Sequence, residues 1–251
     1  MNPIMSGIGD RLARFLNQPD PHYKPLATSD PRSVAEVIAP GDILLVEGNT
    51  RFSKAIKYLS QSTWSHAALY VGEQLPDGEK GQWLVEADVV EGVITLPLQK
   101  YADLHTRICR PVGLSEEDRE RVIGYVLDRI GLHYDLKNII DLARYLLPNP
   151  PVPVRWRRRM LSLGSGDPTR AICSTLIAQA FQSVRYPILP HVTRRPSVRG
   201  DCNDCYDEIL HIRHHSLFVP RDFDISPYFE IVKPALAQGF DYQRITWSDA
   251  D

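Results

Sequence analysis

Short apolar segments alternate with polar turns along most of the chain, and they predict a fold of strands and helices. Four consecutive apolar residues at Ile43–Val46 indicate a buried strand. The turn residues Pro76, Asp77 and Gly78 separate two later strands. Five further segments indicate strands: Ala67–Val71, Trp83–Glu86, Gly92–Leu96, Ile108–Pro111 and Phe229–Val232.

Helical spacing of apolar residues predicts five helices. Two of them have a polar residue that can cap the N-terminus, Ser115 for one and Asn49 or Thr50 for the other. Residues 185–215 are rich in Pro, Arg, Cys and His, and they predict an irregular insertion. The predicted helices cover approximately residues 8–16, 51–59, 116–130, 136–147 and 172–184.

Composition excludes several classes of protein. The chain has 251 residues and is 43% apolar, which suffices for a core, and its formal charge of −2 does not attract nucleic acid as a whole. No apolar run approaches the roughly 18 residues of a membrane span, and the first residues do not resemble a secretory signal. Four cysteines do not make a dense disulfide framework. We therefore expect a cytoplasmic, reducing setting.

Two short segments of the sequence contain residues that can act as a nucleophile and its base. The string 63–72 places His66 on a predicted strand, and the string 171–178 places Cys173 in the first turn of a predicted helix. A helix N-terminus lowers the pKa of a thiol, and an adjacent imidazole activates it. Each residue also has a plainer interpretation, because a buried cysteine often acts as a small apolar group and a lone strand histidine is often structural.

Strand alternation provides the neighbours of the base. His66, Ala68 and Tyr70 share one strand face, and the small Ala68 is expected to leave room for the helix end that carries Cys173. A carboxylate that accepts from the imidazole would fix its tautomer, and Glu86 on the next strand is the first candidate. Asp88 shares the face of Glu86 and is the alternative.

The two strings together resemble a known family. Gly41-Asp42 before a strand, followed by His-x-x-Leu-Tyr-x-Gly from His66, resembles the base half of the NlpC-type papain-like peptidases. The cysteine helix follows the histidine here, and this order resembles the circularly permuted branch, the permuted papain-like amidases. Three supporting strings are Val85-Glu86-Ala87, Tyr134-Asp135 and Val219–Phe223.

This resemblance implies an α+β fold, the circularly permuted papain-like fold, with a central antiparallel sheet or partial barrel packed on the nucleophile helix. It implies a catalytic domain over residues 33–235 that contains the insertion 185–215. An N-terminal helix and extended connector would cover residues 1–32, and a C-terminal tail would cover 236–251. The sites implied are Cys173 as nucleophile, His66 as general base and Glu86 as the orienting group.

The implied activity is cysteine hydrolysis of an amide or isopeptide bond through an acyl-enzyme, with a peptidoglycan-type peptide as one substrate. It needs no metal or organic cofactor. The expected partner is a small peptide or an amide or acyl substrate, with no nucleic acid and no integral membrane segment, and the oligomeric state stays open. An acyltransferase or lipid hydrolase is the alternative enzyme, because the lecithin:retinol acyltransferase-like relatives share the permuted order.

Other clusters suggest further alternatives. Cys202 and Cys205, followed by His211 and His214, suggest a non-catalytic module stabilised by zinc, although their spacing is shorter than in a zinc finger. Cys109 is expected to be inert, and Asp42 to be a hydrogen-bonding residue at a strand entry. Two arginine clusters flank the cysteine helix and predict either a solvated face or a contact to an anionic substrate group: Arg155, Arg157, Arg158 and Arg159, and Arg194, Arg195 and Arg199.

Overall fold

The computed structural model describes residues 29–88, 91–132, 172–196 and 206–244, together with a few isolated positions near residues 18–27 and residue 246. Several predicted features lie outside the described residues, namely the helices over 8–16 and 136–147, Tyr134 and Asp135, Cys202 and Cys205, the arginines 155–159 and Arg199. Only the backbone is described at Arg194 and Arg195.

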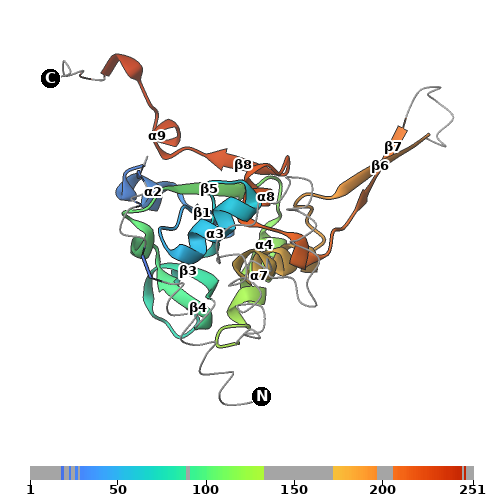
Figure 1. Ribbon diagram of the computed structural model, residues 1–251, viewed down its shortest axis with the longest axis horizontal. Helices are drawn as coiled ribbons and strands as arrows, with labels where there is room; N and C mark the ends of the chain where they lie inside the picture. The colour runs from blue at the N-terminus through green and yellow to red at the C-terminus, as the bar shows by residue number, and fades with distance from the viewer. Residues whose placement is uncertain are drawn as a thin grey trace.

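A six-stranded sheet forms the centre of the molecule (Figure 1). Its strand order is β4-β3-β2-β1-β5-β8, and every neighbouring pair is antiparallel. All six strands predicted from the sequence are present. Their bounds are β1 Ile43–Val46, β2 His66–Gln74, β3 Lys80–Asp88, β4 Gly92–Pro97, β5 Thr106–Pro111 and β8 Phe229–Val232.

The central position of β1 follows from its composition. All four residues of β1 are apolar and almost fully buried, because both faces of this strand are covered. The strand pairs with β2 on one side and β5 on the other. Its last residue, Val46, lies opposite His66. The histidine therefore lies at the end of the sheet where β1 leads into the next helix.

Two helices begin at the caps that the sequence predicts. Thr50, rather than Asn49, caps one helix by accepting from the Ser53 N–H, and Ser115 caps another by accepting from the Asp118 N–H. The α-helices are α2 Pro31–Val37, α3 Arg51–Ser60, α4 Glu116–Leu127, α7 Ile172–Ser183, α8 Pro220–Asp224 and α9 Pro234–Ala237. Three short 3-10 helices are η1 Leu98–Tyr101, η2 His215–Leu217 and η3 Tyr242–Arg244.

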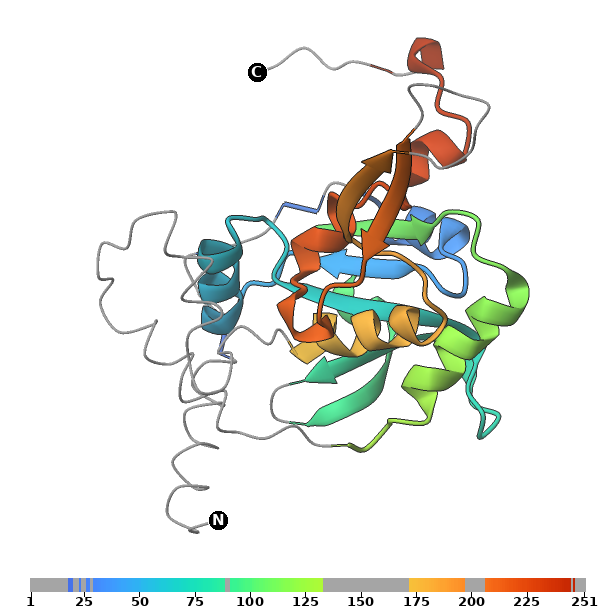
Figure 2. The same cartoon turned by 90° about the vertical axis from the view of Figure 1, so that its right-hand side faces the viewer.

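The two faces of the sheet are covered by different elements. Helices α7 and α4 lie against one face, as Figure 2 shows, and their apolar residues form one core with Ala67, Leu69 and Val85. Helix α2 and η1 cover the other face, where Ala68 and Tyr70 are buried. The expectation that Ala68 makes room for the cysteine helix is therefore wrong. The strand period separates the two faces but does not say which face a later helix covers.

The described parts of residues 185–215 are not irregular as predicted. They contain the antiparallel hairpin β6 His191–Pro196 and β7 Tyr206–His211, which extends away from the central sheet (Figure 1). Its register pairs His191 with His211 and Val192 with Leu210. The many polar residues hid the strand pattern, because both strands of a projecting hairpin have solvent on their faces and do not need strict apolar alternation.

No helix in the described parts of the chain combines the length and the apolar character needed to cross a membrane.

Candidate active site

His66 and Glu86 meet on neighbouring strands. His66 is the first residue of β2 and Glu86 lies near the end of β3. Their side chains are in contact, with 2.7 Å between His66 Nε2 and Glu86 Oε2. Glu86 is 2% exposed, so the contact is shielded from water on the carboxylate side. The sheet therefore holds an imidazole and a carboxylate in hydrogen-bonding geometry.

Two further side chains hold Glu86, and the sequence did not indicate either of them. Lys100 Nζ lies 2.9 Å from Glu86 Oε1, and the Tyr101 hydroxyl donates a hydrogen bond to Oε2. Both residues belong to η1, which follows β4. Their segment carries no motif and no period, so the only available signal was the general rule that a buried carboxylate needs donors.

The surroundings of Glu86 favour its ionised form. Burial by itself raises the pKa of this carboxyl group, but the charge and hydrogen bond of His66, with Lys100 and Tyr101, outweigh burial and lower the pKa to about 2. Tyr101 shows the opposite effect, because burial and the adjacent carboxylate raise the pKa of its phenol well above the ordinary value. Tyr101 therefore stays a donor.

Cys173 lies beside the same imidazole. It is in the first turn of α7 and is 4% exposed. Burial opposes the thiolate, yet the charge and hydrogen bond of His66, the backbone N–H of Ala67 and the Ser174 hydroxyl lower the pKa of the Cys173 thiol. Ser174 Oγ lies 3.9 Å from Sγ. A thiolate at a helix start gains from the helix dipole as well.

The pKa of His66 shifts in the direction opposite to that of Cys173. Burial disfavours the imidazolium, but Glu86 and Cys173 raise the pKa of His66 well above its ordinary value. A raised imidazole pKa and a lowered thiol pKa together favour a thiolate–imidazolium pair. Such a pair is the reactive form of a cysteine nucleophile.

The three side chains line one cavity. Its volume is about 300 Å³, and its wall includes His66, Glu86 and Cys173. Asn49 and Thr50, from the β1–α3 loop, line another part of it. We refer to this space as the nucleophile cavity. It has room for several ligand atoms next to the Cys173 sulfur.

Two other acidic residues that the sequence suggested, Asp88 and Asp42, have partners other than His66 and Cys173. Asp88, the alternative to Glu86, also lines the nucleophile cavity, but its carboxylate accepts from the Glu91 N–H at 2.9 Å in the turn after β3. Asp42 accepts from the Ala39 N–H at 2.8 Å and from Arg110 at 2.7 and 2.9 Å. It therefore has the predicted role at the entry to β1.

Cys109 contrasts with Cys173. It lies in β5 with no measurable exposure, and burial raises the pKa of its thiol. Its thiol therefore stays protonated near neutral pH, in agreement with the prediction that it is inert. It provides an internal comparison for the reactivity of Cys173.

The predicted zinc site is only half described. His211 Nε2 bonds the Thr193 hydroxyl at 2.9 Å, and His214 Nδ1 bonds the Ser216 hydroxyl at 2.7 Å. Among the residues with a described structure, no three His, Cys, Asp or Glu side chains group closely enough to hold a metal ion. Cys202 and Cys205 lie outside those residues.

Comparison with known proteins agrees with the family suggested by the two strings. Residues 37–145 match the model of the permuted papain-like amidase enzymes of the YaeF/YiiX, C92 family. This is a family of papain-like amidases and peptidases, and the match confirms the predicted resemblance over the part of the chain that contains His66 and Glu86. Cys173 lies beyond the matched residues.

The search of solved structures finds a likeness to the metalloprotein yiiX from Escherichia coli O157:H7. The two chains are 16% identical, the alignment covers 84% of this chain and 98% of the other, and the TM-score is 0.44. None of the curated proteins matches this chain.

Proposed function

We propose, with the match of residues 37–145 to the model of the permuted papain-like amidase family as the premise, that this protein is a cysteine hydrolase of amide or isopeptide bonds. Cys173 is the nucleophile, His66 is the general acid and base, and Glu86 orients His66. The observation that carries the proposal is that one partly buried imidazole contacts a buried carboxylate at 2.7 Å and lies beside a thiol whose pKa it lowers.

The first half of the reaction forms an acyl-enzyme. The Cys173 thiolate attacks the substrate carbonyl carbon, a C–S bond forms, and the carbonyl oxygen becomes an oxyanion. The Cys173 backbone N–H at the helix start is one candidate donor for that oxyanion. The intermediate then collapses, the C–N bond breaks, and the His66 imidazolium gives its proton to the departing amine.

The second half releases the acyl group. His66, now neutral, takes a proton from a water molecule, and the resulting hydroxide attacks the thioester carbonyl carbon. The C–S bond breaks, a carboxylic acid leaves, and the thiolate–imidazolium pair forms again. Glu86 stabilises the imidazolium in each half because its carboxylate stays ionised. Lys100 and Tyr101 act as positioning residues because both bind Glu86.

A small peptide is the substrate class that this proposal favours, and a peptidoglycan-type peptide is one member of that class. A reducing, cytoplasmic setting belongs to the same proposal, because the reaction requires the Cys173 thiol to remain reduced. The reaction consumes only water besides the substrate.

The test is to trap the acyl-enzyme with a set of peptide amides of aminomethylcoumarin. The expected result is release of the fluorophore together with a mass increase equal to the acyl group on Cys173. Cys173→Ala should abolish both signals, whereas Cys109→Ala, which changes a buried thiol outside the cavity, should keep them. Turnover that survives in Cys173→Ala would refute the assignment.

A further inference from the structure

A second and larger cavity lies next to the nucleophile cavity. Its volume is about 610 Å³, within the range of roughly 300–1,000 Å³ typical of small-ligand sites. Both cavities include Asn49 and Thr50 in their walls, so they meet at the β1–α3 loop. We refer to the second space as the outer cavity. A substrate that lies across this loop would reach from Cys173 into it.

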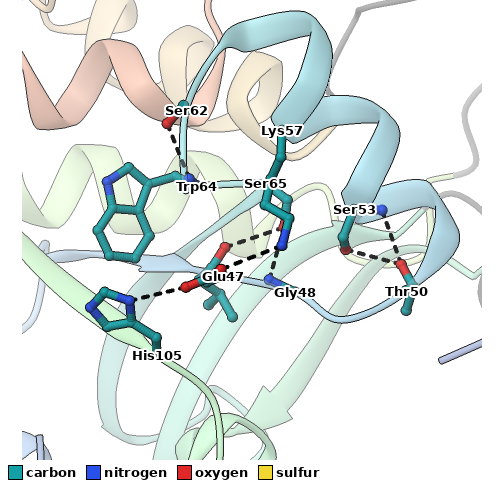
Figure 3. A network of polar contacts seen from close by, with 10 residues as sticks. Glu47, Gly48, Thr50, Ser53, Lys57, Ser62, Trp64, Ser65 and His105 are labelled. Carbon is teal, nitrogen blue, oxygen red and sulfur yellow. Dashed lines mark hydrogen bonds and ion pairs between the residues drawn. The ribbon is translucent and has the colours of Figure 1, made fainter. Parts of the chain in front are cut away.

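The loop between the two cavities is firmly held (Figure 3). The Gly48 N–H donates to the Ser65 hydroxyl at 2.9 Å, and Thr50 caps α3. A Cβ atom at Gly48 would lie 2.2 Å from the Ser53 hydroxyl oxygen and 3.0 Å from Ser53 Cβ, so a larger residue there would displace Ser53 from its contact with Thr50. The β1–α3 loop is therefore a well-ordered ridge between the two cavities, and a substrate can lie across it.

Aromatic rings form one wall of the outer cavity. The rings of Trp64 and His105 lie 5.0 Å apart, and the Arg107 guanidinium lies 4.9 Å from the Trp64 ring. Trp64 is 3% exposed, so its position is set by packing. The Trp64 ring therefore backs this wall, and the more exposed side chains of His105 and Arg107, at 20% and 36%, face the cavity.

The two carboxylates at the outer cavity already have donors on all four oxygens. Lys57 and His105 approach the Glu47 carboxylate from two sides, as Figure 3 shows, at 3.4 Å from Oε1 and 3.1 Å from Oε2. Asp224 accepts from Arg107 at 2.6 Å on Oδ1 and from the Trp64 indole N–H at 3.0 Å on Oδ2. These acids are thus engaged within the protein and contribute little to the recognition of a cationic ligand.

The balance of charge and donors favours an anion. The described wall contains three permanent cations, Lys54, Lys57 and Arg107, against the two carboxylates. A guanidinium carries five N–H donors, and the bond from Arg107 to Asp224 engages only Nη1. Arg107 therefore brings to the outer cavity N–H donors beyond the one that Asp224 engages, next to the cavity that contains Cys173.

From this geometry we propose that the outer cavity is a substrate subsite that binds an anionic group, a carboxylate or a phosphate, on the same molecule whose acyl group reaches Cys173. The proposal rests on the proposed hydrolase function and extends it to the substrate. The substrate is then an amide or peptide with an anionic group some distance from the scissile bond. Arg107 is the principal donor, Trp64 provides the wall, and Lys54 adds positive charge at the rim.

Alkylating reagents of matched shape test the subsite directly. Iodoacetyl-glycine, iodoacetyl-γ-aminobutyrate and iodoacetyl-ε-aminocaproate place a carboxylate at increasing distance from the same electrophile, and each has a neutral primary amide as its counterpart. In every case the thiolate displaces iodide and an S–C bond forms. At the tail length that spans the ridge, the carboxylate reagent should label Cys173 roughly fivefold or more faster than its amide, the size expected for a partly exposed charged contact.

Two variants test whether the preference for the carboxylate reagent comes from the outer cavity. Arg107→Gln should bring the ratio of carboxylate to amide labelling towards one, whereas Lys80→Gln, which changes an exposed lysine at the start of β3, should leave it unchanged. A reagent with a phosphonate tail of the same length distinguishes recognition of a carboxylate from recognition of a phosphate. The reagent that labels Cys173 faster identifies the anionic group that the subsite prefers. A ratio near one at every tail length, while Cys173 still labels faster than Cys109, would overturn the subsite and leave the hydrolase proposal standing.

An equilibrium binding measurement tests the subsite even if Cys173 is not reactive. N-acetyl-ε-aminocaproate, its amide and the matching phosphonate would be titrated into Cys173→Ser, with the Trp64 indole N–H followed by NMR. Either anion, but not the amide, should shift this resonance. Slow Cys173 labelling refutes the hydrolase proposal, whereas the absence of any anion-dependent shift refutes the subsite.

Discussion

Replacing Glu86 by glutamine should weaken the folded state in a manner that depends on pH. The change keeps the shape of the side chain but removes the negative charge between His66, Lys100 and Tyr101. The pKa of Glu86 is lowered from 4.5 to about 2, and this difference corresponds to about 3 kcal/mol in favour of the ionised form in the folded protein. The side chain is 2% exposed, so solvent screens this energy little.

The sign of the pH effect follows from the lowered pKa. A carboxyl group with a lower pKa in the folded state contributes its full stabilisation above the unfolded value of 4.5 and loses it as the pH falls towards 2. By pH 3, about 2 kcal/mol of the contribution from Glu86 should be gone. His66 is protonated in both states over this range, so it adds no pH dependence there.

The assay is chemical denaturation of the parent protein, Glu86→Gln and Asp88→Asn at several pH values between 6 and 3. The parent should lose about 2 kcal/mol more than Glu86→Gln over this interval, because the other carboxyl groups titrate in both proteins. Asp88→Asn, which changes a nearby carboxylate held in a turn, should follow the parent. Parallel curves for the parent and Glu86→Gln would refute the account of Glu86 as a buried, ionised partner of His66.

Three other predictions test the site. Near neutral pH, iodoacetamide should modify Cys173 before Cys109, because the pKa of the first thiol is lowered and that of the second is raised; peptide mass spectrometry measures the order, and equal labelling would argue for a structural role of Cys173. His66→Ala should reduce turnover of a validated amide by about 10²- to 10⁴-fold with the fold intact by circular dichroism, and near-parent turnover would exclude the base assignment. Tyr101→Phe removes a donor that holds the Glu86 carboxylate against His66, so a displaced Glu86 should stabilise the imidazolium less and labelling of Cys173 should require a higher pH while the protein remains folded; an unchanged pH profile would show that Tyr101 is merely structural.

Local signals predicted most of the secondary structure because they act within a few residues. Thr50 and Ser115 cap helices through hydrogen bonds to residues three positions later, so each cap and its helix are adjacent in the sequence. The four apolar residues of β1 indicate burial on both faces wherever the strand is placed. The β6–β7 hairpin was missed because its strands project into solvent and carry many polar residues, so no apolar alternation marks them.

The site was predictable in part, for a related reason. His66 and Cys173 were identified from residue type and context, and alternation along β3 selected Glu86 and Asp88 together. Only the folded chain distinguishes these two carboxylates, because Glu86 contacts His66 while Asp88 bonds in a turn. Lys100 and Tyr101 were not predicted, because η1 carries no pattern that points to Glu86.

The amino-acid sequence by itself determined the six strands of the central sheet, the helices α3, α4 and α7, the residue types able to form a thiol–imidazole pair and the order in which they occur. Tertiary structure alone decided that α7 packs against the Ala67 face, that Glu86 has three donors, and that the outer cavity opens beside the nucleophile cavity. The physical reason is the separation along the chain over which each kind of interaction acts. Caps and periodicity are interactions between near neighbours, whereas a buried charge and a shared cavity depend on side chains that only folding brings together.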